Sequence, residues 1–117
     1  MNRALPVNEN QMDLVFQALA NVTRRALLAR LRGGPARVTE LAKPFNMSLN
    51  AISKHLIVLE HAGLITRSSA GRVQYCRLGA KPMAQASNWL LTYQEFWDEN
   101  LNKLTRFVES GADLKEK

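Results

Sequence analysis

The sequence predicts a mainly α-helical chain with one small β-hairpin, in the order α-α-α-α-β-β-α. Hydrophobic residues recur three and four positions apart over most of its length, which is the spacing of one helical face. Between residues 64 and 78 this spacing gives way to two β-prone runs around a glycine. The chain has 117 residues, so we expect a single domain over residues 1–117.

Two helices are expected after a loose arm at residues 1–7. Asn8 and Gln11 have the spacing of a capping box, and Asn21 is the expected N-cap of the second helix. The Gly-Gly-Pro run at 33–35 ends that helix, because glycine allows a left-handed cap and proline cannot continue the hydrogen-bond ladder. The apolar face of the first helix consists of Met12, Val15, Phe16 and Leu19.

Residues 39–62 are predicted to form a helix, a tight turn and a second helix. Thr39 caps a short first helix that Pro44 limits, because the residue before a proline is pushed out of the helical region. Ser48 then caps a longer helix that runs to about Ala62, with Gly63 as its C-terminal cap. The inner stripe of this longer helix is Ile52, Leu56 and Leu59.

The hairpin at 64–78 joins two strands through the polar residues 69–72, and a long helix over about 82–109 follows it. Pro82 suits the first turn of that helix, and a frayed tail is expected over 111–117. Near-heptad spacing predicts that the helix packs against other helices along its whole length. The spaced residues are Met83, Ala86, Leu90, Tyr93, Trp97, Leu101, Leu104 and Val108.

The charge is concentrated in the middle of the chain. The formal net charge is +6, but residues 22–81 contain eleven bases and only two acids, Glu40 and Glu60, which gives +9. A basic chain favours a polyanionic partner, and a sixty-residue basic segment favours a nucleic-acid footprint over scattered solvated side chains.

The longer helix of residues 39–62 has the side chains that DNA reading requires. A second helix after a tight turn lies across the major groove, where asparagine pairs with adenine and lysine reaches guanine or phosphate. Ala51 and Ile57 could contact a thymine methyl group, and the alternative is a plain solvated face. The outward positions are Asn50, Ala51, Ser53, Lys54 and Ile57.

Phosphate contacts are expected at three further positions. Arg72 lies at the hairpin tip and Arg67 on its first strand, where an arginine suits phosphate or the minor groove. Ser48 could bind phosphate at the helix N-terminus or serve only as a cap, and both roles remain open.

Other classes of protein are disfavoured. No Ser-His-Asp set, paired carboxylates or phosphate loop is present, so we expect no enzyme and no cofactor. No apolar run reaches membrane-spanning length and no secretory signal is evident, so a cytoplasmic protein without a membrane partner is expected. Cys76, the one cysteine, is predicted to be a half-buried packing residue, since a redox role needs a lowered pKa or a second thiol.

Four segments of the chain have a combined pattern that is specific to one family: LANVTRRALL at 19–28, VTELA at 38–42, MSLNAISKHLIVLEHAGLI at 47–65 and GRVQYCRL at 71–78. Through them the chain resembles the ArsR family of bacterial winged helix-turn-helix transcriptional repressors over about residues 12–108. The resemblance implies a nucleoid-associated homodimer that binds a pseudo-palindromic operator in double-stranded DNA and represses its own or a neighbouring operon.

The chain departs from this family in its metal-binding residues. Metal-sensing members carry a Cys-x-Cys element in the helix that here spans 39–43, which has no thiol, and the segment 82–117 has neither His nor Cys. We therefore expect no metal, and either a non-metal effector or none. The resemblance also implies a basic side chain on the longer helix of residues 39–62, at the position where this chain has Ile57. It further implies that His55 has a structural role or faces a phosphate.

Five of the eight aromatic residues, Trp89, Tyr93, Phe96, Trp97 and Phe107, lie in the last helix. A dimer core is the first interpretation, and a pocket for a small apolar effector is the second. The alternative function is a dimeric protein-interaction module that uses this aromatic helix. The predicted dimer residues, on the first and last helices, are Met12, Val15, Phe16, Leu19, Met83, Ala86, Leu90, Tyr93, Trp97, Leu101 and Leu104.

Overall fold

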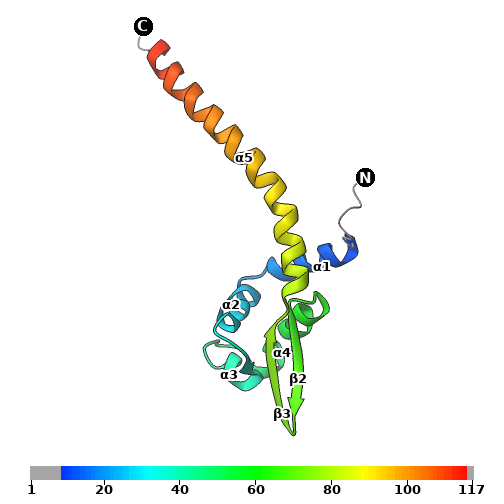
Figure 1. The fold of residues 1–117 in the computed structure, drawn as a ribbon. Coiled ribbons are helices and arrows are strands. Elements are labelled where there is room, and N and C mark those ends of the chain that lie inside the picture. The colour runs from blue at the N-terminus through cyan, green and yellow to red at the C-terminus, as the bar shows by residue number, and fades with distance from the viewer. Residues whose placement is uncertain (1–8, 116–117) are drawn as a thin grey trace. The chain divides into compact units, whose positions relative to one another are not determined.

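The computed structural model describes the backbone of residues 9–115 and the side chains of residues 10–111. The predicted arm at 1–7 and the Asn8 cap lie outside these residues. Packing divides the chain into a unit that ends at Ala86 and a second unit that begins at Ser87, within the last helix. The elements, drawn in Figure 1, are α1 (Glu9–Leu19), α2 (Val22–Leu31), β1 (Ala36–Arg37), α3 (Val38–Ala42), α4 (Leu49–His61), β2 (Ile65–Ala70), β3 (Val73–Leu78) and α5 (Ala80–Lys115).

The ends of α2 and α4 confirm the capping predictions. The backbone N–H of Arg24 donates to Asn21 Oδ1 over 3.1 Å, and that of Ala51 donates to Ser48 Oγ over the same distance. α4 ends in a Schellman motif in which Gly63 has a left-handed φ of +77°. Its two closing bonds run from the N–H of Gly63 to Glu60 and from that of Leu64 to Leu59, at 2.9 and 3.0 Å.

α3 begins one residue earlier than predicted, and Thr39 is not its cap. The N-cap residue is Arg37, whose side chain makes no capping hydrogen bond. Val38 is buried in the core, so the chain enters the helix directly from β1. Burial of an apolar side chain therefore outweighs the capping preference of threonine at this position.

The hairpin is confirmed, but its loop is shorter and its sheet wider than predicted. β2 extends to Ala70, which pairs with Val73, so only Gly71 and Arg72 form the loop, and Gly71 has a φ of +64°. The sheet has the strand order β1-β3-β2, with Arg37 of β1 paired to Tyr75 of β3. The sequence did not predict β1, because a strand of two residues is too short to show the alternation that marks a strand.

The core of the first unit is formed around the inner stripe of α4. Ile52, Leu56 and Leu59 are fully buried, as predicted, and pack with residues from every other element of that unit. Val15 and Ala86 belong to the same core, so their prediction as dimer-interface residues is wrong. Each is covered within a single chain and offers no surface to a partner.

α5 is longer than predicted at both ends. It begins at Ala80, which still places Pro82 in the first turn, and it continues to Lys115. The helix continues through 111–115, where the sequence predicted a tail, because Gly111 has no left-handed φ and does not stop it. In the part of the chain that the structure describes, no helix combines the length and apolar character needed to cross a membrane.

The core assignment is testable with adjacent residues of α4. We expect Leu56→Ala to lower the free energy of unfolding by about 2–5 kcal/mol, since it leaves a cavity at a fully buried position. Ile57→Ala, at a side chain that is 43% exposed, should change it by no more than about 0.5 kcal/mol. Urea denaturation of both variants measures the difference. Equal losses would contradict the orientation of α4.

Candidate nucleic-acid interface

The side of α4 opposite the buried stripe faces solvent. Asn50, Lys54 and Ile57 are exposed, as predicted for a reading face, whereas Ala51 and Ser53 are half-buried. Lys54 makes no hydrogen bond or ion pair with any side chain that the structure describes, so its ammonium group is available to an external anion. This face can therefore offer an amide, an ammonium group and apolar surface to a groove.

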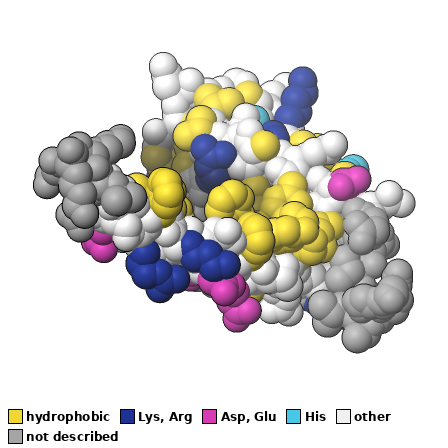
Figure 2. Space-filling view, turned by 90° about the horizontal axis from the view of Figure 1, so that it is seen from above, with side chains coloured by type: hydrophobic (Ala, Val, Ile, Leu, Met, Phe, Trp, Pro, Cys, Tyr) yellow, Lys and Arg dark blue, Asp and Glu magenta, His cyan; other side chains and the backbone are white. Residues whose placement is uncertain are grey.

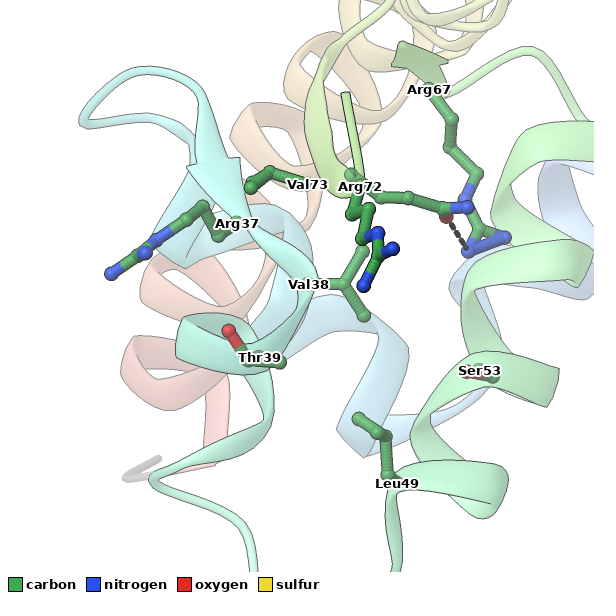
Figure 3. A pocket seen from close by; sticks show the side chains of 9 residues that line it. Arg37, Val38, Thr39, Leu49, Ser53, Arg67, Arg72 and Val73 are labelled. Carbon is green, nitrogen blue, oxygen red and sulfur yellow. Dashed lines mark hydrogen bonds between the residues drawn. The ribbon is translucent and has the colours of Figure 1, made fainter. Parts of the chain in front are cut away.

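A groove of about 390 Å³ separates α4 from the hairpin and from the start of α3. Figure 3 shows Arg72 reaching into its centre, between Thr39 of α3 and Ser53 of α4, whereas Arg37 points away. The groove thus places a guanidinium group among hydroxyl groups, which suits an oxyanion such as a backbone phosphate. The residues that line it are Arg37, Val38, Thr39, Leu49, Ser53, Arg67, Arg72, Val73 and Gln74.

Arg67 contacts other side chains of the same chain, which its position in the sequence did not indicate. Its Nη2 donates to Gln74 Oε1 over 3.2 Å, and its Nη1 lies 3.8 Å from a carboxylate oxygen of Glu60 on α4. Only 20% of the side chain is exposed, and its Nε is buried without an acceptor among the described residues. Arg67 therefore ties the hairpin to α4, and a direct phosphate contact would have to break these interactions.

Several other bases of the +9 segment also have partners within the chain. Arg24 donates to the carbonyls of Gln17 and Ala18, and Arg25 donates to that of Leu19, so both satisfy the open C-terminal end of α1. Arg37 pairs with Glu40 at 3.0 Å, and this pairing lowers the pKa of the Glu40 carboxyl. Total charge therefore overstates what the surface offers to DNA.

Ser48 combines its two predicted roles only in part. Its Oγ accepts the Ala51 N–H, which confirms the cap. The hydroxyl hydrogen is still able to donate, and the residue is exposed at the start of α4. A phosphate contact by Ser48 stays a prediction.

His55 lies behind the reading face and contacts Arg24. Its Nδ1 is 3.1 Å from Nη1 of Arg24, and since a guanidinium only donates, Nδ1 is the acceptor and Nε2 carries the proton. Burial, and secondly the positive charge of Arg24, lower the pKa of His55. The ring is therefore neutral near pH 7 and links α2 to α4, a structural role.

Cys76 is completely buried on β3, between the exposed residues Tyr75 and Arg77. Burial raises the pKa of its thiol, so the thiolate that oxidation requires is disfavoured. Packing is thus confirmed as its role, and its burial is more complete than predicted. Among the residues described, no three His, Cys, Asp or Glu side chains gather as a metal site would require.

Thr39 and Gln74 are polar groove residues that sequence reasoning missed, and it also did not place Arg37, Val38, Leu49 or Val73 there. Thr39 was assigned to a cap, and Gln74 to an ordinary strand position. A signal for Gln74 was available, because it lies two residues from Arg72 and alternate strand residues share a face. Thr39 gave no such signal, since only the tertiary fold brings α3 to the groove.

α5 presents a long apolar stripe to solvent after Ala86. Leu90, Tyr93, Trp97, Leu101 and Leu104 are 48–57% exposed. The rings of Trp89 and Tyr93 lie 4.8 Å apart and those of Phe96 and Trp97 5.6 Å apart, but none of these rings lines the groove beside α4. Figure 2, a view from above, shows hydrophobic side chains gathered on that face of the molecule, with charged side chains beside them.

Comparisons with known proteins agree with this geometry. The profile of a family described as a helix-turn-helix domain matches residues 19–68. The chain is 33% identical over 90 residues to the transcriptional repressor SdpR of Bacillus subtilis (strain 168), covering 77% of this chain and 100% of SdpR.

Two solved structures are also similar. The ArsR family transcriptional regulator RHA00566 has a TM-score of 0.72 and 44% identity, with 79% of this chain and 95% of that chain covered. The homodimeric winged helix-turn-helix DNA-binding domain Mb0332 of Mycobacterium bovis, a possible ArsR-family regulator, has a TM-score of 0.59 and 29% identity, with 79% and 82% covered.

The burial of His55 beside Arg24 predicts how stability depends on pH. The unfolded chain protonates His55 below about pH 6.5, whereas the lowered pKa delays protonation in the folded chain. The free energy of unfolding should therefore be highest above that pH and fall as the pH decreases from it. Urea titrations at pH 7.5 and 5.5 measure this loss.

Two histidine variants show which residue causes the loss of stability at low pH. His55→Asn keeps an acceptor for Arg24 without titrating in this range, so the difference between the two pH values should shrink. His61→Asn, at an exposed position on the same helix, should keep the wild-type difference. An unchanged difference in His55→Asn would show that other groups cause it.

Proposed function

The chain belongs to the ArsR family of winged helix-turn-helix transcriptional regulators, and from this premise we propose that it is a homodimeric repressor. Its target is a pseudo-palindromic operator in double-stranded DNA, so it acts in the cytoplasm at the nucleoid. The observation that carries the proposal is the groove beside α4, where Arg72 of the wing (the hairpin of β2 and β3) lies between Thr39 and Ser53.

The residues beside this groove divide into two roles. Asn50 and Lys54, with Ser53 behind them, read base edges in the major groove, and Ala51 and Ile57 supply apolar contact to thymine methyl groups. Arg72 with Thr39 holds the phosphate backbone that borders the major groove of the DNA, and Ser48 donates to a neighbouring phosphate. Arg67 acts indirectly, by holding the wing against α4 through Glu60 and Gln74.

The α5 stripe supports a second copy of the chain as the partner. A row of side chains about half exposed over roughly four helical turns is costly in water, and its near-heptad spacing suits another helix. Mb0332 is described as homodimeric, which favours the same assembly here. Met12, Phe16 and Leu19 of α1 and Met83 of α5 keep partial exposure and are proposed to contribute. Two recognition helices would then meet half-sites about 34–36 Å apart.

Repression is supported by SdpR, which is named a transcriptional repressor. We propose that the chain represses its own or a neighbouring operon, with a non-metal effector or none. The same apolar stripe also favours a second candidate, a dimeric protein-interaction module in which DNA binding is secondary. The repressor requires Lys54 to discriminate between DNA sequences, whereas the protein-interaction module does not.

DNA binding gives the first test. A duplex selected by the wild-type protein from a random pool is compared with a scrambled duplex in gel shifts at two salt concentrations. Lys54→Ala should weaken binding to the selected duplex by about 1–3 kcal/mol and affect the scrambled one less. Arg72→Ala should weaken both duplexes alike and reduce the salt slope by about one.

Arg30→Ala is the matched control, because it removes one exposed charge that does not line the groove. Its binding should stay close to that of the wild type at both salt concentrations. The groove-reading proposal fails if Lys54→Ala and Arg72→Ala both bind the selected duplex like the wild type.

Dimerisation gives the second test. Trp97→Glu places a carboxylate in the middle of the α5 stripe and should convert the dimer to monomers in sedimentation at micromolar concentration. Asn102→Glu adds the same charge on the opposite side of α5 and should leave the dimer intact. A Trp97→Glu variant that remained dimeric would contradict the proposed interface.

A further inference from the structure

A second cavity, of about 400 Å³, lies within the first packed unit. Its wall is almost wholly apolar and comes from the end of α1, one side of α2, the end of β3 and the first turns of α5. Leu28 of α2 forms part of it, together with Leu78 and Met83, which are 41% and 37% exposed. None of its residues lines the groove beside α4, so the two sites are separate.

Two arginines border this cavity. Arg25 of α2 and Arg32, the C-cap residue of that helix, lie seven residues apart, so they project from the same side. Because the wall is apolar, they contribute their aliphatic stems and keep their guanidinium groups at the edge. The carbonyl of Leu19, itself a wall residue, accepts from Arg25 Nη1 over 2.7 Å and holds that group in place. Arg32 makes no side-chain hydrogen bond or ion pair with a described residue.

No acidic residue offsets these charges in the segments that form the wall. Residues 19–32 and 78–83 contain five bases and no Asp or Glu. Uncompensated guanidinium groups favour a carboxylate or another oxyanion through short, charge-assisted hydrogen bonds. A cavity of this volume is in the range of small-molecule sites.

We propose that this cavity binds an amphipathic anion, a molecule with one apolar chain and one carboxylate head group. The chain covers Leu28, Leu78 and Met83, and the head group bonds to Arg32 and to the remaining N–H groups of Arg25. This binding requires neither DNA nor the groove beside α4, so its failure would leave the proposed DNA contacts standing. A second copy of the chain is the competing occupant, since Leu19 and Met83 are also proposed at the dimer interface.

Calorimetric titration of the full-length protein with decanoate, below its micelle concentration, tests the proposal. Decanoate should bind once per chain, and decyltrimethylammonium, with the same chain length and opposite charge, at least about tenfold more weakly. Arg32→Glu should weaken decanoate binding at least about tenfold, whereas Arg30→Glu, an exposed charge outside the wall, should leave it unchanged. Equal binding of the two amphiphiles, or of decanoate by wild type and Arg32→Glu, overturns the proposal.

Ala29→Trp tests the cavity independently of charge. Ala29 is an exposed wall residue, so the indole should fill the cavity and abolish decanoate binding while circular dichroism and thermal unfolding stay as in the wild type. Sedimentation of the same variant identifies the occupant. Conversion of a wild-type dimer to monomers by Ala29→Trp would assign the cavity to a second copy and overturn the proposal, as would undiminished decanoate binding.

Discussion

Complete burial of one side of α4 is the constraint on which the rest of the structure depends. Ile52, Leu56 and Leu59 together set the rotation of the helix about its axis, because turning it by one residue would expose all three. Ser48 and Gly63 then fix where the helix begins and ends. With rotation and ends set, the exposure of Asn50 and Lys54 follows from core packing and needs no separate interaction.

Electrostatics in this chain serve the fold before they serve a partner. Arg24 and Arg25 close the end of α1, and Arg67 joins the wing to α4. A DNA complex therefore releases fewer counterions than a segment charge of +9 implies, since these guanidinium groups already have partners. Lys54 on the exposed side of α4 and Arg72 in the groove are charges that remain available, so the salt dependence of binding should report on them in particular.

What the sequence predicted well depends on neighbours in the chain. The caps at Asn21 and Ser48, the turn at Gly71 and the α4 stripe each follow from local chemistry or from a period, and the structure confirms them. The errors arise where long-range packing decides. Periodicity marked Val15 as apolar without showing that its own chain covers it. Arg67 is drawn inward by Glu60 and Gln74, which only strand register and the position of α4 bring near. The candidate DNA contacts at Asn50 and Lys54 are exposed as predicted, because their exposure follows from the period of the buried stripe.

The stripe of α5 shows how a single period can serve two kinds of packing. Ala86 is 2% exposed and Leu90, four residues further along the same face, is 48% exposed. Nothing in the spacing distinguishes the two, so the difference comes from where the core of the first unit ends. Residues before that point stabilise the folded chain, whereas residues after it leave apolar surface exposed for the proposed second copy. A ligand beside Met83 would contact the segment just before this change, together with Leu78 at the end of the wing. An amphipathic anion there would therefore act on the elements that hold the wing and begin α5, without occupying the DNA groove.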